Sequence, residues 1–175
     1  PNHAYDGSKL RGPIVVRLAQ PGERITTLDD VDRALDRADL LITDDSGPIG
    51  IAGVMGGAST EIDATSSTVV IECASFDPVT IARASRRHKL SSEASKRFER
   101  GVDPNAAYAA AHRVAALLVE LAGGTLSPDE TVAGAVAVPP LTEFAADLPA
   151  RVLGTDVSAE RVVEVLEASG VTVER

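Results

Sequence analysis

The sequence predicts a mixed fold in which short β-strands come first and helices follow. Turn dipeptides such as Pro21-Gly22 divide the first third of the chain into short, β-rich apolar runs. Two Asp-Pro pairs, at Asp77 and Asp103, then introduce stretches with helical spacing. Hydrophobic residues make up 44% of the 175 residues and charged residues 25%, so the composition is globular and argues against disorder throughout.

Strands are predicted where β-rich apolar runs lie between turns. Residues 14–19 form the first run. Residues 40–43 and 49–55 flank an Asp-Asp-Ser-Gly-Pro turn, and this arrangement predicts a hairpin. Residues 68–74 form a further strand, in which Glu72 interrupts an apolar run.

Helices are predicted from spacing and from capping residues. The spacing in residues 29–38 fits a short helix. Asp77 caps a helix that runs to about Arg87, and Asp103 caps a longer helix that Gly123-Gly124 ends. The apolar stripe expected on the longer helix consists of Ala107, Ala111, Val114, Leu118 and Leu121.

We expect one domain and the beginning of another. Residues 1–126 form the first domain, and residues 127–139 form a linker with Ser, Pro and Asp. Residues 140–175 hold a helix from Ser158 to Ser169 and the start of a strand at 171–173, and about 35 residues are too few to fold securely alone. The first residue is not Met, so we expect a piece of a longer protein.

Charge is distributed unevenly along the chain. The net charge of −9 argues against a general nucleic-acid coat protein or a membrane-surface anchor, both of which need a positive field. Residues 83–100, here called the basic island, nevertheless carry seven basic and two acidic residues, a net charge of +5. A solvated helix face and a contact with an anion, such as the phosphates of a folded RNA, are both open interpretations.

Several kinds of site are excluded by composition. The lone Cys73 allows neither an intrachain disulfide nor a Cys-based zinc cage, and we expect it to pack as a small hydrophobe. The three His show no metal spacing, and aromatic residues at 3% are too few for a surface that stacks single-stranded nucleic acid. No apolar stretch approaches the roughly 20 residues that span a bilayer, so a cytoplasmic protein is expected.

Two features have more than one interpretation. Residues 50–57 are Gly-rich but lack both the Gly-Lys-Ser/Thr ending and the G-x-G-x-x-G pattern of phosphate loops. Close backbone packing and a pocket wall remain open for them. Glu72 must be ion-paired, hydrogen-bonded or functional, because burying an unpaired carboxylate is costly.

Six motifs in this order resemble one family. They are His3-Ala4-Tyr5-Asp6, Lys9-Leu10-x-Gly12, Thr27-Leu28-Asp29, Gly53-Val54-Met55-Gly56-Gly57, Glu72-Cys73-Ala74-Ser75-Phe76, and Ser92 through Pro104. Together they resemble the central B3/B4 module, the editing domain, of the bacterial phenylalanine–tRNA ligase (phenylalanyl-tRNA synthetase) β subunit. The resemblance covers residues 1 to about 126, and the residues from about 139 on resemble the start of the next module, B5.

The resemblance implies both a fold and a reaction. The fold is α+β, with stacked, mainly antiparallel β-sheets and helices packed on them, followed by a truncated small α+β module. The reaction is post-transfer editing, the hydrolysis of the ester of mischarged tyrosyl-tRNA(Phe). An apolar synthetic pocket rejects an added hydroxyl poorly, whereas a second site that hydrogen-bonds this hydroxyl selects the error.

Individual roles follow from the resemblance. Glu72 would accept a hydrogen bond from the tyrosyl hydroxyl, and His3 would be the catalytic candidate near the scissile ester. An ordered water would attack, with backbone N–H groups as oxyanion donors. The other implied substrate-binding residues are Gly56 and Gly57 in the pocket wall, Ser92 as a lining polar group, and Ala94 as the pocket floor.

Partners are implied in the same way. They are the acceptor end of tRNA(Phe), the ligase α subunit and a second β subunit in an α2β2 assembly, with neither DNA nor a membrane. Arg86, Arg87 and Lys89 of the basic island are the expected tRNA contacts. ATP and magnesium belong to aminoacylation by the whole ligase, and no cofactor is expected for this fragment. An alternative is a non-catalytic tRNA- or subunit-docking module, inactive as an isolated fragment.

Overall fold

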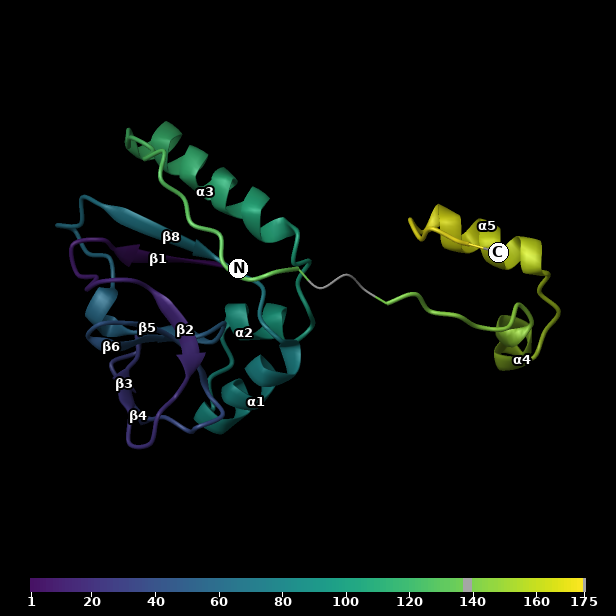
Figure 1. The fold of residues 1–175 in the computed structure, drawn as a ribbon, viewed down its shortest axis with the longest axis horizontal. Helices are drawn as coiled ribbons and strands as arrows, with labels where there is room; N and C mark the ends of the chain where they lie inside the picture. The colour runs from purple at the N-terminus through teal and green to yellow at the C-terminus, as the bar shows by residue number, and fades with distance from the viewer. Residues whose placement is uncertain (137–139, 175) are drawn as a thin grey trace. The chain divides into compact units, whose positions relative to one another are not determined.

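In the computed structural model, antiparallel sheets and helices build an α+β fold, which confirms the predicted class (Figure 1). The structure describes residues 1–136 and 140–174. The chain divides into two units, Pro1–Val136 and Ala137–Arg175. The last three residues of the predicted linker, 137–139, lie outside the described residues.

The elements of the first unit follow in chain order. The strands are β1 (Asn2–Asp6), β2 (Val15–Leu18), β3 (Arg24–Thr26), β4 (Asp32–Ala34), β5 (Leu40–Asp44), β6 (Gly47–Ile51), β7 (Met55–Gly56) and β8 (Val69–Cys73). The helices are the 3-10 turn η1 (Ala58–Thr60), α1 (Pro78–His88), α2 (Glu93–Phe98) and α3 (Ala106–Ala122). The predicted strands at 14–19, 40–43 and 68–74 are confirmed.

The largest sheet has the strand order β2-β5-β6-β7, and all its pairs are antiparallel. The predicted hairpin is the β5–β6 pair, which turns at residues 45–46. Successive residues on a strand point to opposite faces. Leu41 accordingly packs in the core that α1 and α2 cover, whereas Ile42 packs with Tyr5 of β1.

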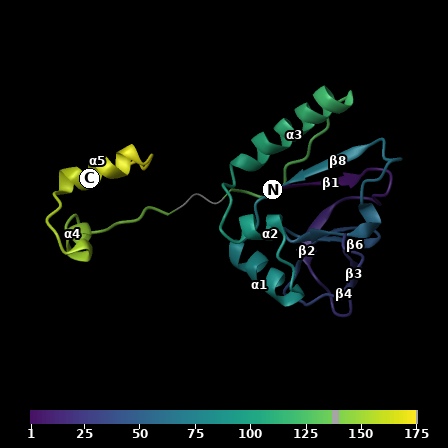
Figure 2. The ribbon, with the colours of Figure 1, turned by 180° about the vertical axis from the view of Figure 1, so that it is seen from behind.

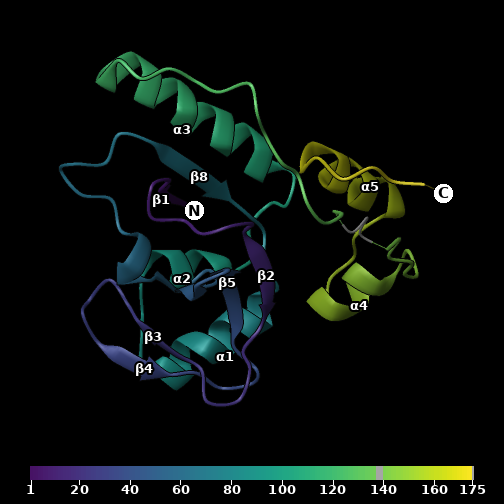
Figure 3. The ribbon, with the colours of Figure 1, turned by 60° about the vertical axis from the view of Figure 1, so that its left-hand side comes forward.

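A two-stranded ribbon of β1 and β8 forms the next layer. Its strands are antiparallel although they lie far apart in the sequence, and His3 pairs with Glu72 while Tyr5 pairs with Val70. Helix α3 packs on β8. Figures 2 and 3 show α3 and α1 at opposite ends of this stack, with the ribbon and the largest sheet between them.

The predicted helix at residues 29–38 is wrong. Part of this segment is strand β4, which pairs with β3. Asp30 has φ 59°, a left-handed conformation that a regular helix does not contain. It lies in a tight turn, closed by hydrogen bonds between Thr27 and Val31 and between Asp30 N–H and the Thr27 carbonyl. The ion pair of Arg24 with Asp32 joins the two strands.

The helix caps were predicted in part. Asp77 caps α1 by accepting from the Thr80 N–H at 2.7 Å, as predicted. Asp103 does not cap α3: its carboxylate accepts from the Asn105 N–H at 2.9 Å, which holds the chain in a turn and delays the helix to Ala106. Gly123, in the left-handed conformation, ends α3 as predicted.

The predicted apolar stripe of α3 is correct only in the first half of the helix. Ala107, Ala111 and Val114 are partly buried, but Leu118 is 37% and Leu121 77% exposed. A 17-residue helix is about 25 Å long, whereas a five-residue strand such as β8 covers about 17 Å. The strand therefore leaves the end of the helix uncovered.

The second unit contains α4 (Leu148–Leu153) and α5 (Ala159–Ala168). Ser158 caps α5 by accepting from the Arg161 N–H at 3.2 Å, as predicted. The predicted start of a strand at residues 171–173 is wrong, because these residues lie outside any strand. The Val171 N–H is used to close the end of α5, donating to the Leu166 carbonyl at 3.0 Å.

Candidate functional site

A pocket of about 270 Å³ lies in the first unit, between residues of β1, β8, the β6–β7 region and α2. Five residues that the sequence predicts for one site line it together: His3, Gly56, Glu72, Ser92 and Ala94. Gly57 and the three predicted tRNA contacts, Arg86, Arg87 and Lys89, are not among the lining residues.

Glu72 is a partly buried carboxylate in a pocket wall. The hydroxyl of Tyr5 donates a hydrogen bond to its Oε2. Burial raises the pKa of Glu72, and the hydrogen bond from Tyr5 offsets part of that rise. The pKa of Tyr5 is itself raised by burial and by the charge of Glu72, so this hydroxyl stays protonated and remains a donor.

His3 stands beside Glu72 because the two residues are directly paired in the ribbon. Its ring packs edge-on against Tyr5, with the ring centroids 4.6 Å apart and an interplanar angle of 67°. Burial lowers the pKa of His3, which favours the neutral imidazole. Within residues 1–136 and 140–174 no group hydrogen-bonds to this ring, so a ring nitrogen is available to accept a proton.

The two adjacent glycines have different neighbours. A Cβ on Gly56 would lie 2.4 Å from His3 Cε1, so the missing side chain makes room for the imidazole. A Cβ on Gly57 would lie 2.9 Å from the backbone oxygen of Ile49, which accepts the Gly57 N–H at 2.8 Å. Gly56 therefore belongs to the pocket, whereas Gly57 permits close backbone packing.

Ser92 and Ala94 come to the pocket on α2. The Ser92 hydroxyl accepts from the Ser95 N–H at 3.0 Å as the helix cap, and it donates to the Val54 carbonyl at 2.7 Å. Ser92 thus ties α2 to the Gly-rich segment, and its hydroxyl is occupied by internal bonds. Ala94 is small and leaves space at the position where it lines the pocket.

Aromatic lining residues were not predicted from the sequence as site residues. Phe76 and Phe98 both line the pocket, with ring centroids 5.1 Å apart and planes tilted by 53°. Both lie inside the motifs that carry the resemblance, and this is the signal that could have found them. A mostly apolar pocket with a few polar groups is typical of a small-ligand site.

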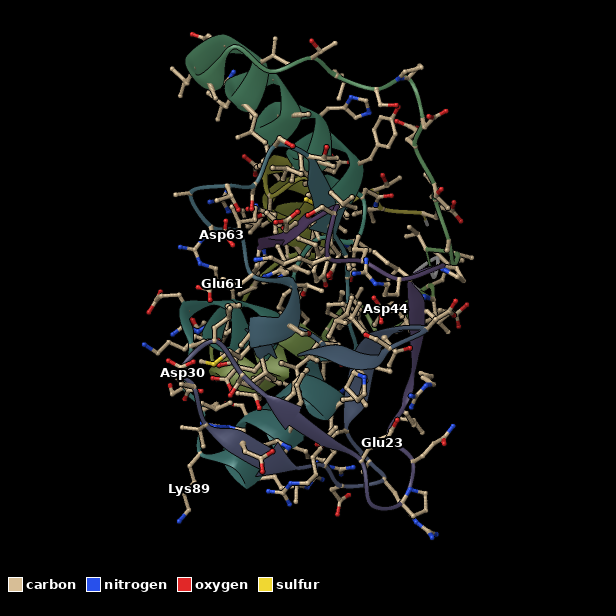
Figure 4. The ribbon with its side chains drawn as sticks, turned by 90° about the vertical axis from the view of Figure 1, so that its left-hand side faces the viewer. Glu23, Asp30, Asp44, Glu61, Asp63 and Lys89 are labelled. Atoms are coloured by element: carbon tan, nitrogen blue, oxygen red, sulfur yellow. The ribbon has the colours of Figure 1, made fainter. Side chains whose placement is uncertain are left out.

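The basic island divides into free and internally paired charges. Arg86 and Lys89 are exposed and form no ion pair within the described part of the chain. In Figure 4 the side chain of Lys89 points outward, away from the protein. Arg87 instead pairs with the fully buried Asp39, to which His88 Nε2 is also bound at 2.6 Å. Arg87 therefore has a structural partner that the sequence did not reveal.

Neither a metal cluster nor a membrane span is found in the described part of the chain. Residues 1–136 and 140–174 contain no group of three or more His, Cys, Asp and Glu that could hold a metal ion. Over the same ranges, no helix is both long and apolar enough to cross a membrane. Burial raises the pKa of Cys73, which favours its unreactive thiol form.

Comparison with known proteins places this geometry in a family. The model of the B3/4 domain matches residues 1–123, and the chain belongs to this family. The chain is 56% identical to the phenylalanine–tRNA ligase beta subunit of Cutibacterium acnes over 173 residues, which are 99% of the chain and 20% of that protein. The predicted resemblance is thereby confirmed.

Other ligase beta subunits give the same result. The subunit of Streptomyces avermitilis is 56% identical over 97% of the chain and 21% of its own length. That of Leifsonia xyli is 67% identical over 71% of the chain and 15% of its own length. The chain thus spans about a fifth of the length of the curated relatives it matches.

Proposed function

We propose that the pocket edits tRNA(Phe) that has been mischarged with tyrosine, by hydrolysing the aminoacyl ester. The observation that carries this proposal is a partly buried carboxylate, Glu72, in a pocket otherwise lined mainly by apolar and aromatic side chains. A tyrosyl ring would pack near Phe76 and Phe98 while its hydroxyl donates to Glu72. A phenylalanyl ring would desolvate the carboxylate without giving it a donor, which is costly.

In the proposed reaction a water attacks the carbonyl carbon of the ester. The attacking water gives up a proton, the carbon–oxygen bond to the ribose breaks, and a proton is delivered to the departing ribose oxygen. His3 is the candidate proton carrier, because its imidazole is held neutral beside Glu72 and has no internal hydrogen bond. Backbone N–H groups of the pocket would stabilise the negative charge that develops on the carbonyl oxygen.

The proposed partners follow from the family. The acceptor end of tRNA(Phe) would bring the ester to the pocket, with Arg86 and Lys89 as free cations for its phosphates. We propose that the chain works within a β subunit that assembles with the ligase α subunit and a second β subunit in the cytoplasm. Aminoacylation with ATP and magnesium would take place elsewhere in that ligase.

A deacylation assay tests this proposal. Tyrosyl-tRNA(Phe) and phenylalanyl-tRNA(Phe) are offered separately to the chain and to the assembled ligase, and the remaining ester is measured over time. We expect faster loss of the tyrosyl ester, because of the two substrates only the tyrosyl ester brings a hydroxyl that can donate to Glu72. Hydrolysis of neither ester, or of both at the same rate, would refute the editing function.

A second candidate function is docking to another part of the ligase. Strand β2 lies at the edge of the largest sheet and, together with the residue that precedes it, exposes four apolar side chains. They are Ile14, Val15, Val16 and Leu18. An exposed apolar edge strand favours contact with another protein surface. If the unmutated protein shows no hydrolysis, docking remains as the function.

The basic island gives a prediction about tRNA binding. Neutralising Arg86 and Lys89 together, as Arg86→Gln and Lys89→Gln, should weaken tRNA binding. The slope of the logarithm of the binding constant against the logarithm of the salt concentration should fall by about one for each charge removed. Arg87→Gln should instead lower the melting temperature, because Asp39 then keeps a buried charge with one partner fewer. Binding titrations at several salt concentrations and thermal melts measure the two effects. Unchanged binding by the double variant would show that this part of the island is only a solvated face.

A further inference from the structure

We propose that Tyr5 is a positioning residue that determines how strongly the pocket selects tyrosine, an inference that rests on the proposed editing function. Tyr5 contacts Glu72, the residue expected to meet the substrate hydroxyl. The resemblance implied no role for Tyr5. Its hydroxyl donates to one carboxylate oxygen, Oε2. The other oxygen, Oε1, is left for the substrate.

The backbone places Tyr5 where it can do this. His3 pairs directly with Glu72, and Tyr5 lies two residues further along β1 on the same face of the ribbon. Tyr5 is thus the diagonal neighbour of Glu72, within reach of a long side chain. The contact depends on the register of two strands that come from opposite ends of the first 75 residues.

Tyr5 is also held rigidly. Its side chain is almost completely buried and packs in a cluster with Ile42, Ile49 and Ala52 of the largest sheet. A hydroxyl fixed by such packing can hold the carboxylate in one orientation before the substrate arrives. Pre-orientation of this kind strengthens recognition, because less conformational freedom is lost on binding.

The carboxylate has room for two donors at once. An ionised carboxylate has two oxygens and about four acceptor positions, of which Tyr5 occupies one. In residues 1–136 and 140–174 no second donor to Glu72 is found. The hydrogen bond from Tyr5 also favours the ionised form that burial disfavours. An ionised acceptor binds the substrate hydroxyl more strongly than a neutral one.

Tyr5→Phe tests the inference, since it removes the hydroxyl and keeps the ring that packs against His3. We expect the ratio of kcat/KM for the tyrosyl ester to kcat/KM for the phenylalanyl ester to fall about tenfold in the assembled ligase. The phenylalanyl reaction should change little. Tyr108→Phe is the matched control, because Tyr108 is exposed on α3 and contacts His112, away from the lining residues.

The pH dependence separates positioning from a merely structural role. Loss of the Tyr5 donor should raise the pKa of Glu72 further, so tyrosine selectivity in the Tyr5→Phe variant should appear at a higher pH. Carbon-13 NMR of the Glu72 carboxyl in the 175-residue chain measures this pKa without relying on activity. An unchanged pKa and an unchanged selectivity in the variant would overturn the inference.

A rise in tyrosine selectivity in the Tyr5→Phe variant would also overturn the inference, because it would mean that Tyr5 competes with the substrate for Glu72. Glu72→Gln, assayed in parallel, separates this inference from the function. If Glu72→Gln lowers the selectivity and Tyr5→Phe does not, the role of Tyr5 is refuted and editing stands. If the unmutated protein discriminates between neither ester, editing fails and the inference fails with it.

Discussion

Glu72→Ala is expected to remove most of the discrimination between tyrosyl and phenylalanyl esters. A hydrogen bond to a charged group contributes about 1.5–3 kcal/mol, so the loss in selectivity should be roughly ten- to a hundredfold. The deacylation rates of the two esters measure it. Glu61→Ala is a suitable control, because it removes an exposed carboxylate that does not line the pocket.

Folding should suffer less than selectivity from Glu72→Ala. Burial raises the pKa of Glu72 in the folded state, so the folded protein binds this proton more readily than the unfolded chain. Stability from this group is therefore complete below the ordinary glutamate pKa and falls as the pH rises through the raised pKa. The alanine variant has no carboxyl group and does not lose stability in this way. The difference in stability between the variant and the unmutated protein should therefore shrink as the pH rises from 4 to 7. Denaturant unfolding at both pH values checks this, and a growing deficit toward pH 7 would contradict it.

Gly56→Ala is expected to remove hydrolysis while the protein stays folded. The new Cβ would lie 2.4 Å from Cε1 and 2.6 Å from Nε2 of His3, so the imidazole must leave its position beside Glu72. A displacement of about 1 Å in an active site can cost on the order of a hundredfold in rate. A stopped-flow or filter assay of tyrosyl-tRNA(Phe) deacylation measures the loss.

Gly57→Ala provides the matched comparison. Its Cβ would meet the backbone oxygen of Ile49 at 2.9 Å, and a backbone atom within a sheet cannot turn aside as a side chain can. Overpacking of this kind costs about 1–3 kcal/mol, so this variant should lose stability first. Full activity in Gly56→Ala, or equal stability in both variants, would show that the two glycines do not differ in this way.

The sequence predicted correctly those elements that depend on residues close together in the chain. The Asp77 cap, the turn at residues 45–46 and the left-handed Gly123 all depend on residues within a few positions of one another. The turn through Asp30 was missed, because a left-handed aspartate is not distinguishable from a helical one by spacing alone. Asp103 was read as a cap for a similar reason, since one carboxylate can serve either a cap or a turn.

The candidate site was predicted less from spacing than from the resemblance. His3, Gly56, Glu72, Ser92 and Ala94 do line one pocket, although by spacing alone Gly56 and Glu72 had other interpretations. Tyr5 was not predicted as a site residue, because its partner Glu72 is 67 residues away and the contact exists only once β1 pairs with β8. Strand β1 was not predicted, because Asn2–Asp6 contains no β-branched residue.

The β1–β8 ribbon has a consequence for how the site would come apart. Two strands alone are marginally stable in water, so this ribbon depends on α3 behind it and on the largest sheet in front of it. His3, Tyr5 and Glu72 all belong to the ribbon and would separate in a single local opening event. Amide hydrogen exchange in β8 would then report the lifetime of the assembled site. A substitution at the buried Ala115 on α3 could shorten that lifetime without touching the pocket.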